Sequence, residues 1–300
     1  MMSTPEHAAE LAASPPPIEG IGSAPLEGVY DMEEAAYHAR PEISKHDLDA
    51  LDRAPALFLH QRSAPKDPTP AMRFGSLLHR VVLEPDRFEA ETVLMPAGID
   101  RRTKDGKAAW AAFEAQAVGL EIVTQQELDQ LHAIREAVFS HPSAAQLLAP
   151  GGRVEASLFW LDSETGVRCR GRVDKVHPSQ KILVDLKSTK DASAQAFARS
   201  CWNLRYDVQA AFYLDGWATV GPVLESPPQF CWIAVETEPP YLVACYVATP
   251  AMIEAGRERY RRNLRRYAEC LAADQWPGLS DRIEPLDLPA WAVRSLEPTP

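Results

Sequence analysis

A short stretch between residues 172 and 188 carries two carboxylates and a lysine at a spacing that could do chemistry. Asp185 and Lys187 are two residues apart, and residues at positions i and i+2 of a strand point to the same face. Asp174 lies near the end of the preceding predicted strand. Two aspartates could hold a hard metal ion, and a neighbouring lysine would lie beside the water that the metal activates. The stretch therefore indicates a metal-dependent catalytic centre.

Four further residues could share this centre, although each of them alone is ordinary. Gln209 and Tyr213 are four apart on a predicted helix and therefore share one helix face. His79 lies on a predicted helix early in the chain, where a single histidine is most often structural. Glu155 begins a predicted strand and could point to the same face as the aspartates. Without these neighbours, an aspartate and a lysine on one strand would fit a solvated salt bridge equally well.

The residues around this centre predict strands, and helices surround them. Residues 154–161 and 167–176 form a hairpin pattern around a turn at residues 162–166. Further strands are expected at 182–187, 230–235 and 242–247, and helices at 72–83, 124–139, 194–204, 207–220 and 252–273. This order predicts one mixed sheet covered by helices on its faces, in an α/β or α+β sandwich.

The first 35 residues have a different composition from the rest. They contain seven acidic residues and no Lys or Arg, and they are rich in Ala, Pro and Gly. A segment with so little apolar surface is expected to be disordered, with order beginning near Tyr37. The formal net charge is −11 for the whole chain but −4 without this segment. Local basic patches, rather than net charge, therefore decide whether nucleic acid is a partner.

Several classes of protein are excluded by the sequence. No run of eighteen apolar residues is present, so no transmembrane helix is expected, and the N-terminus lacks the basic and apolar regions of a secretory signal. The five cysteines are widely spaced and include no C-x-x-C pair, so neither a zinc site nor an iron–sulfur cluster is indicated. This usage of cysteine favours a reducing, cytoplasmic setting.

Taken in order, these residues resemble a known family. The set resembles the RecB-type branch of the PD-(D/E)XK nucleases, and in particular the phage and prophage exodeoxyribonuclease VIII group, the RecE-like nucleases. The motifs are Gly75-x-x-x-His79, Glu155, Gly171–Arg172–Val173–Asp174, Asp185–Leu186–Lys187 and Gln209-x-x-x-Tyr213. The similarity spans about residues 36 to 291. It implies a restriction-endonuclease-like core, in which a central mixed β-sheet is flanked by helices on both faces.

The resemblance implies a set of metal ligands. Asp174 and Asp185 would bind Mg²⁺ or Mn²⁺, with the backbone carbonyl of Leu186 as a further ligand and His79 completing the shell. Glu155 would bind a second metal or hold a water. Oxygen ligands suit Mg²⁺, which also keeps several waters. The first acid lies in Gly-Arg-Val-Asp rather than Pro-Asp, a variant that is common in the RecB-type branch.

The resemblance also implies catalytic and DNA-binding roles. Lys187 would orient or deprotonate the attacking water and stabilise charge in the transition state. Gln209 and Tyr213 would position the scissile phosphate or the strand being cut. A basic loop is expected to contact phosphates, and two strand arginines could line the approach to the metal, although at least one is expected to form a salt bridge instead. These cationic residues are Arg101, Arg102, Lys104 and Lys107 in the loop, and Arg170 and Arg172 on the strand.

The function implied is a metal-dependent exonuclease that degrades linear double-stranded DNA from 5′ to 3′. Its 3′ single strands would serve a single-strand annealing protein, and the chain would form a homo-oligomer. Two alternatives stay open: an endonuclease or single-strand exonuclease with the same centre, and a non-catalytic DNA-binding or partner-binding module. We expect a tail at 1–35 and a single nuclease domain at 36–300, divided into a mainly helical part (36–150), a catalytic sheet (151–250) and a C-terminal helix and tail (251–300).

Overall fold

A computed structural model describes residues 27–63 and 68–288 of the chain. Helices dominate the N-terminal half, which contains β1 (Gly28–Asp31), α1 (Glu34–His38), α2 (Lys45–Arg53), α3 (Pro55–Ser63), α4 (Pro70–Leu83), α5 (Pro85–Glu91), β2 (Thr92–Leu94), α6 (Lys104–Gln116), β3 (Glu121–Val123), α7 (Gln125–Ser140) and α8 (Pro142–Leu147). The C-terminal half contains β4 (Arg153–Leu161), β5 (Arg168–Val176), β6 (Ile182–Thr189), α9 (Ala194–Asn203), α10 (Tyr206–Val220), β7 (Gln229–Glu236), β8 (Val243–Val247) and α11 (Pro250–Ala273).

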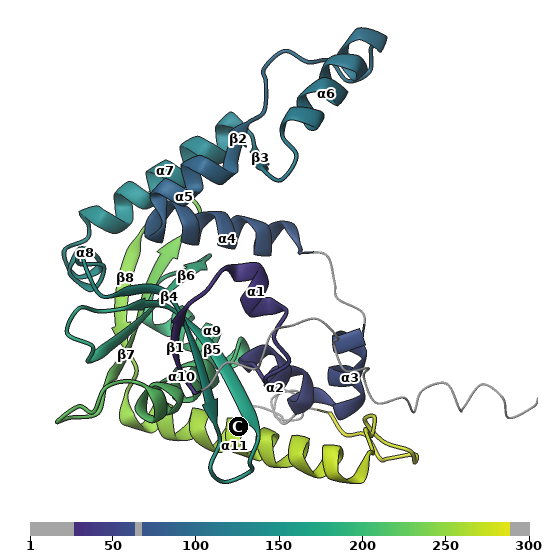
Figure 1. The fold of residues 1–300 in the computed structure, drawn as a ribbon, viewed down its shortest axis with the longest axis vertical. Coiled ribbons are helices and arrows are strands. Elements are labelled where there is room, and N and C mark those ends of the chain that lie inside the picture. The colour runs from purple at the N-terminus through teal and green to yellow at the C-terminus, as the bar shows by residue number, and fades with distance from the viewer. Residues whose placement is uncertain (1–26, 64–67, 289–300) are drawn as a thin grey trace, which may run out of the picture.

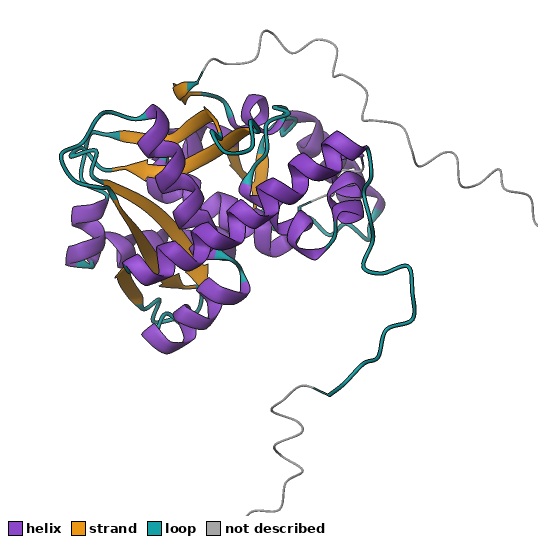
Figure 2. Cartoon of the chain, turned by 90° about the horizontal axis from the view of Figure 1, so that it is seen from below, coloured by secondary structure: helices purple, strands orange, loops and turns teal. Residues whose placement is uncertain are grey.

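Six strands form the central sheet in the order β1-β4-β5-β6-β7-β8. β6 and β7 run parallel, and the other neighbouring strands of this sheet are antiparallel. Helices α10 and α11 lie over one face, and α4, α7 and α8 lie over the other (Figures 1 and 2). The prediction of an α/β fold with a mixed sheet flanked by helices on both faces is therefore confirmed.

The two faces of the sheet bury two separate hydrophobic cores. One core includes Trp160, Val173 and Phe212 and lies between the sheet and α10. The other includes Val184 and Leu186 of β6 and lies under α4 and α7. α10 is buried on nearly all sides because it lies between the sheet and α11, and a helix in that position is apolar around its whole circumference. The side chains of β6 alternate as expected, with Asp185 and Lys187 on the face opposite to Val184 and Leu186.

The ordered body begins earlier in the chain than the sequence indicated. Residues 28–31, which were expected to belong to a disordered tail, form β1 and pair with β4, with Val29 opposite Leu158. Half-buried Val29 packs against the core on the α10 side of the sheet, and this long-range contact cannot be seen in local composition. The remainder of the predicted tail, residues 1–26, lies outside the described residues.

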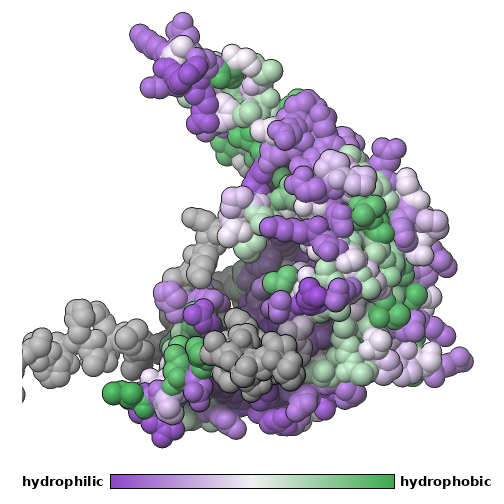
Figure 3. All heavy atoms as spheres, turned by 180° about the vertical axis from the view of Figure 1, so that it is seen from behind, coloured by the Kyte–Doolittle hydropathy of each residue, from purple (hydrophilic) through white to green (hydrophobic). Residues whose placement is uncertain are grey.

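The predicted basic loop at residues 100–107 is half helical. Thr103 accepts a hydrogen bond from the backbone N–H of Gly106 and caps α6, which begins at Lys104. None of the residues of α6 is buried, and the helix projects from the body on an arm that includes β2 and β3 (Figure 1). The arm is visible from the other side in Figure 3, where hydrophilic residues cover its tip. Among the described residues, no helix is long and apolar enough to cross a membrane.

Replacing each of two glycines by alanine is expected to change the free energy of unfolding in opposite directions. A Cβ on Gly256 of α11 would lie 2.1 Å from the backbone oxygen of Asp207, whereas nothing lies within 4 Å of a Cβ on Gly75 of α4. We expect Gly256→Ala to lower the free energy of unfolding by about 1–3 kcal/mol because two helices must separate. Gly75→Ala should raise it by up to about 1 kcal/mol because alanine favours the helix. Urea unfolding measures both, and equal effects of the two substitutions would contradict this account of the packing.

Candidate active site

The site lies where strands β5 and β6 move apart. Their ladder pairs Val176 with Leu183 and Lys175 with Val184, and it ends there. At the next position the Asp174 side chain takes the place of a backbone partner, because its Oδ2 atom accepts a hydrogen bond of 2.8 Å from the Leu186 N–H. The carboxylate therefore bridges the two strands where their ladder ends, and it is buried there.

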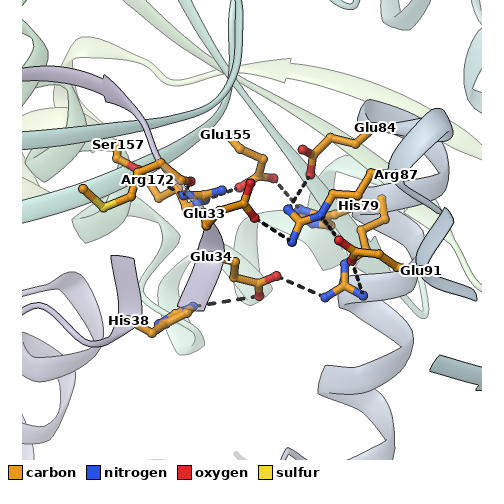
Figure 4. A network of polar contacts seen from close by, with 12 residues as sticks. Glu33, Glu34, His38, His79, Glu84, Arg87, Glu91, Glu155, Ser157 and Arg172 are labelled. Atoms are coloured by element: carbon orange, nitrogen blue, oxygen red, sulfur yellow. Dashed lines mark hydrogen bonds and ion pairs between the residues drawn. The ribbon is translucent and has the colours of Figure 1, made fainter. Parts of the chain in front are cut away.

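Three potential metal ligands meet on the α4 side of this opening. Nδ1 of His79 lies 3.4 Å from Oδ2 of Asp174 and 4.0 Å from Oε1 of Glu155. One ligand atom from each of these residues lies within 4.8 Å of the others. Figure 4 shows His79 and Glu155 facing each other from α4 and β4. Two carboxylates and an imidazole form a donor set that suits Mn²⁺ and Mg²⁺ among other divalent ions.

The orientation of the imidazole favours a cation at this point. Nε2 of His79 lies 2.8 Å from the carbonyl oxygen of Leu186, and because a carbonyl only accepts, Nε2 carries the proton. In the neutral ring Nδ1 then presents its lone pair to the carboxylates of Glu155 and Asp174. Ligating histidines commonly donate their second ring N–H to a backbone carbonyl in this way. The carbonyl oxygen of Leu186, which was predicted as a metal ligand, accepts this hydrogen bond from His79.

Glu155 occupies a strained position in its strand. Its φ angle is 50°, in the left-handed region that a side chain disfavours. Its neighbours Val154 and Ala156 pair with Lys175 and Val173, so Glu155 lies opposite Asp174 at a gap in the ladder. Such a backbone conformation costs about 1–3 kcal/mol and persists where the surrounding structure enforces it. Sequence reasoning left the role of Glu155 open, and the structure places this strained residue opposite Asp174.

Arg172 holds the carboxylate of Glu155 in place. Its Nε donates to Oε2 of Glu155 at 2.7 Å, and its Nη1 donates to Ser157 Oγ at 3.0 Å and to the carbonyl of Met32 at 2.7 Å. The other carboxylate oxygen, Oε1, is the one that faces His79. The expectation that at least one strand arginine forms a salt bridge is confirmed.

The two strand arginines do not line a path for DNA, which corrects the sequence prediction. The Arg172 side chain is 10% exposed and Arg170 is 7% exposed. The guanidinium of Arg170 donates to the carbonyl oxygens of Glu42 and Tyr37. Both arginines are buried because α1 and the chain on either side of it cover this strand face, and the alternation within the strand gives no sign of that cover.

A second group of polar residues lies on the α10 side of the opening. Asp185 is 1% exposed, and Nζ of Lys187 lies 2.6 Å from its Oδ2. Nε2 of Gln209, on α10, donates to Oδ1 of Asp185 at 2.7 Å. Nζ of Lys187 also lies 4.8 Å from the centre of the Tyr206 ring. Burial disfavours the ammonium form of Lys187, but the carboxylates of Asp185 and Asp174 outweigh it and raise the pKa of Lys187.

The surroundings of Asp174 change its protonation. Burial raises the pKa of Asp174 to about 7, and the charges of Asp185 and Glu155 act in the same direction. The ammonium of Lys187, and the charge that His79 carries when it is protonated, oppose this shift without cancelling it. Carboxyl groups that repel one another in a buried space provide the electrostatic setting in which a divalent cation binds well.

The structure brings six of the predicted residues together in two neighbouring sets and places a third set on the arm. His79, Glu155 and Asp174 form the possible metal group, and Asp185, Lys187 and Gln209 lie beside it. Asp185 was expected to share the metal with Asp174, but among the described residues the group of three does not include it. Tyr213 lies in the hydrophobic core, with its ring so close to Gly171 that an added Cβ there would lie 2.9 Å from it. The third set, on the arm, is Arg101, Arg102, Lys104 and Lys107.

Sequence reasoning missed the ion pairs that fasten the N-terminal segment beside the site. Glu34 of α1 pairs with Arg80 of α4 at 3.1 Å, and Glu33, directly before α1, pairs with Arg87 of α5 at 3.5 Å (Figure 4). Arg80 directly follows His79, so its pair with Glu34 fixes the turn of α4 that carries the imidazole. The charges at positions 33, 34, 80 and 87 are visible in the sequence, but nothing local connects the first two to the other two.

Comparison with known proteins gives the family context. Residues 47–289 match the model of a family described as a PDDEXK-like domain of unknown function (DUF3799). The matched range includes the six residues that the structure brings together at the site. No curated protein matches the chain.

Solved structures share the fold at low sequence identity. A crystal structure of a candidate exonuclease from Eubacterium rectale aligns with a TM-score of 0.58 and 12% identity, over 89% of this chain and all of the other. A phage-related exonuclease from Haemophilus somnus 129PT aligns with a TM-score of 0.32 and 15% identity, over 67% of this chain and 95% of the other. The first likeness shows the fold alone, and the second is too distant to carry an argument.

The raised pKa of Asp174 predicts how stability depends on pH. Between its ordinary 3.8 and about 7 the native state holds a proton that the unfolded state has lost, so the free energy of unfolding falls as pH rises through this window. Asp174→Asn removes the titrating group but keeps an acceptor for the Leu186 N–H. In EDTA we expect the variant to be more stable than the wild type by about 1–3 kcal/mol at pH 8, and equally stable near pH 4.

Thermal unfolding across this pH range, with and without Mg²⁺ or Mn²⁺, measures both effects. Either ion should stabilise the wild type at pH 8 and the variant less, because the ion binds only the ionised carboxylate. Identical pH slopes for the two proteins would contradict the buried, crowded state of Asp174.

Proposed function

Because this chain belongs to the family of PDDEXK-like domains, we propose that it is a nuclease that hydrolyses DNA phosphodiester bonds with the help of a divalent metal ion. The observation that carries the proposal is the meeting of His79, Glu155 and Asp174 beside the Lys187–Asp185 pair, at the point where β5 and β6 separate. The first three would hold the ion, which we propose to be Mg²⁺ or Mn²⁺. When bound, the ion would supply Lewis-acid activation of water and neutralise charge on the phosphate.

The remaining residues act through position and charge. Lys187 stays protonated at neutral pH because its pKa is raised, so it would orient the attacking water and stabilise negative charge in the transition state. That protonated state makes Lys187 a poor base for removing a proton from water. Asp185 holds the ammonium, and Gln209 holds Asp185 from α10. Tyr213 would serve by packing against β5, since its buried ring leaves little access to a phosphate.

The finer proposal is an exonuclease of the RecE-like group. It would degrade linear duplex DNA from 5′ to 3′ and leave 3′ strands for a single-strand annealing protein, as a homo-oligomer in the cytoplasm. The ordered motifs support this assignment, and the structural neighbour from Eubacterium rectale is itself a candidate exonuclease. We further propose that the predicted domain, residues 36–300, acts as a single nuclease domain together with β1, which belongs to the same sheet. A non-catalytic module is disfavoured because the carboxylates and the lysine of the site are all present.

DNA would also contact the arm. Lys104 and Lys107 are exposed at the start of α6, and Arg101 is exposed with its guanidinium 4.2 Å from the Trp110 ring centre. Arg102 is paired with Asp100 through a hydrogen bond of 2.9 Å and would contribute less. Cations on a projecting element can reach the backbone of a long ligand beyond the active site.

The lysine of the site gives the first test. We expect Lys187→Ala to lower the rate of DNA cleavage by about a hundredfold or more, because a buried charge that stabilises the transition state is lost. The matched control is Lys190→Ala, which removes an exposed lysine three residues further along the chain and should leave the rate unchanged. The measurement follows linear and covalently closed circular duplex DNA with Mg²⁺ or with EDTA.

The pattern of products separates the candidate functions. Mg²⁺-dependent loss of linear DNA alone supports the exonuclease, and nicking of the circle supports an endonuclease with the same site. DNA that is bound but not cut by the wild type would support the binding module and overturn the nuclease. A Lys187→Ala protein as active as the Lys190→Ala control would remove Lys187 from the mechanism.

The arm gives a second test, by salt dependence. Lys104→Ala combined with Lys107→Ala should weaken DNA binding and reduce the slope of log affinity against log salt by up to about 2, because each phosphate contact releases about one counterion. Lys181→Ala is the control, because Lys181 is exposed and lies just before β6, at the opposite end of that strand from Lys187. Fluorescence anisotropy in EDTA measures binding without cleavage. An unchanged slope in the double variant would exclude the arm from the DNA interface.

A further inference from the structure

The connection between α9 and α10 has an unusual backbone. Arg205 joins the two helices with φ 58° and ψ 42°, the left-handed conformation that a residue with a side chain disfavours. Glycine is the residue that adopts this conformation without a steric cost. Arg205 is nevertheless only 7% exposed, so its long cationic side chain is folded inward rather than left in solvent.

The guanidinium of Arg205 is held by two aspartates of α2. Nε lies 2.7 Å from Asp49 Oδ1, and Nη1 lies 2.6 Å from Asp52 Oδ2. Lys45, one turn before Asp49, pairs with it at 2.7 Å and also donates to the carbonyl oxygen of Leu204 at 2.9 Å. Helix α2 therefore binds the connection at two points, the side chain of Arg205 and the backbone carbonyl of Leu204.

This arrangement is costly, which argues against an incidental contact. Burying charged groups carries a desolvation penalty that their attraction offsets only with good geometry. Nη2 of Arg205 is buried without a hydrogen-bond partner among the described residues. A strained backbone and an incompletely bonded buried cation in the same residue are typical of a position retained for function.

The first residues after the strained turn reach into the active site. Tyr206 is the next residue, and its ring contacts the ammonium of Lys187. The N–H of Gln209 donates to the carbonyl of Arg205 at 3.1 Å, and the side chain of Gln209 binds Asp185. The direction in which α10 leaves Arg205 thus sets the positions of Tyr206 and Gln209 relative to the Lys187–Asp185 pair.

We infer that Arg205 is a positioning residue for the nuclease, which aligns Lys187 and Asp185 by fixing the start of α10 against α2. The inference rests on the proposed function for its kinetic consequences, whereas its structural part can be tested separately. Within the described part of the chain Arg205 forms no hydrogen bond or ion pair with His79, Glu155 or Asp174, so it would act through Tyr206 and Gln209 and would not bind the substrate itself.

Three substitutions isolate the guanidinium from the backbone. Arg205→Gly keeps the left-handed turn accessible and removes both ion pairs. Arg205→Lys keeps a charge but cannot bridge two aspartates with a planar fork. Asp49→Asn weakens the ion pair with Arg205 from the α2 side. It replaces an Arg205 variant that does not fold. The matched control is Arg262→Ala, because Arg262 also pairs with Asp52, at 3.1 Å, but its side chain is 62% exposed.

A separate control accounts for a general loss of stability. Val138→Ala removes two buried methyl groups from α7, in the core on the opposite face of the sheet. It should lower the free energy of unfolding by an amount comparable to that lost in the Arg205 variants, on the order of 1–3 kcal/mol. All variants are compared at a temperature at which each is folded, so a lower rate in one of them is not due to an unfolded fraction.

Kinetics and hydrogen exchange give two independent readouts. We expect Arg205→Gly to lower kcat by about tenfold or more, equivalent to about 1.4 kcal/mol of transition-state stabilisation, with the KM for DNA changed by less than about twofold. Arg205→Lys should recover part of kcat. Exchange of the backbone amides in residues 205–213 should quicken in Arg205→Gly and Asp49→Asn. In Arg262→Ala and Val138→Ala both kcat and this exchange should stay close to the wild type.

The results that would overturn the inference are distinct from a failure of the proposed function. Wild-type kcat in Arg205→Gly would show that Arg205 is merely structural. An equal loss of kcat in Val138→Ala would show the same. If the wild type cuts no DNA, the proposed function fails, and amide exchange in residues 205–213 alone tests whether Arg205 positions the start of α10. Faster exchange in Arg205→Gly but not in Arg262→Ala then supports the positioning role, and unchanged exchange rejects it.

Discussion

The structure of this site depends on one electrostatic constraint, the crowding of three carboxylates, those of Glu155, Asp174 and Asp185, at the gap between β5 and β6. Burial raises the pKa of Asp174, and the charges of Asp185 and Glu155 act in the same direction. Carboxylates in such a space stay charged only if cations or hydrogen-bond donors lie close to them. Each of the three has such a group, and each group is delivered by a different part of the fold.

The separation of β5 and β6 allows residues from both faces of the sheet to meet. Asp174 and Asp185 belong to opposite faces, the first toward α4 and the second toward α10. In a continuous ladder the sheet would lie between them. Because the ladder ends after Lys175 and Val184, the two carboxyl groups are close enough to influence each other's charge. A gap of this kind needs a substitute partner for the freed backbone, and Asp174 provides it for Leu186.

The sequence predicted those parts of the site that local patterns encode. The alternation in β5 and β6 placed Asp185 and Lys187 together, and the four-residue spacing on α10 placed Gln209 on a face with Tyr213. Local patterns could not show which face of α10 meets the strand, and the structure sends Gln209 to Asp185 and the ring of Tyr213 to Gly171. A spacing rule fixes direction within one element, whereas contacts between elements are set by packing.

The errors of the sequence analysis have a related cause. Arg170 and Arg172 were placed on an open strand face, but the segment around α1 covers them and takes up their hydrogen-bonding capacity. Glu155 was the least defined of the predicted ligands because its backbone conformation, which interrupts the ladder, has no signature in a sequence without glycine at that position. Burial by a distant segment and backbone strain are both properties of the folded chain.

The charges of the site form a coupled set rather than independent pairs. Arg172 fixes one oxygen of Glu155 and leaves the other to His79, which also contacts Asp174. Lys187 pairs with Asp185, and its charge partly offsets the rise in the pKa of Asp174 that burial causes. Removing any one member leaves a neighbour buried without its counter-charge, so the effects of two substitutions within the set will not add. Arg205 pairs with Asp49 and Asp52 and with no member of this set among the described residues, so under the inference above it acts on the set through Tyr206 and Gln209 at the start of α10.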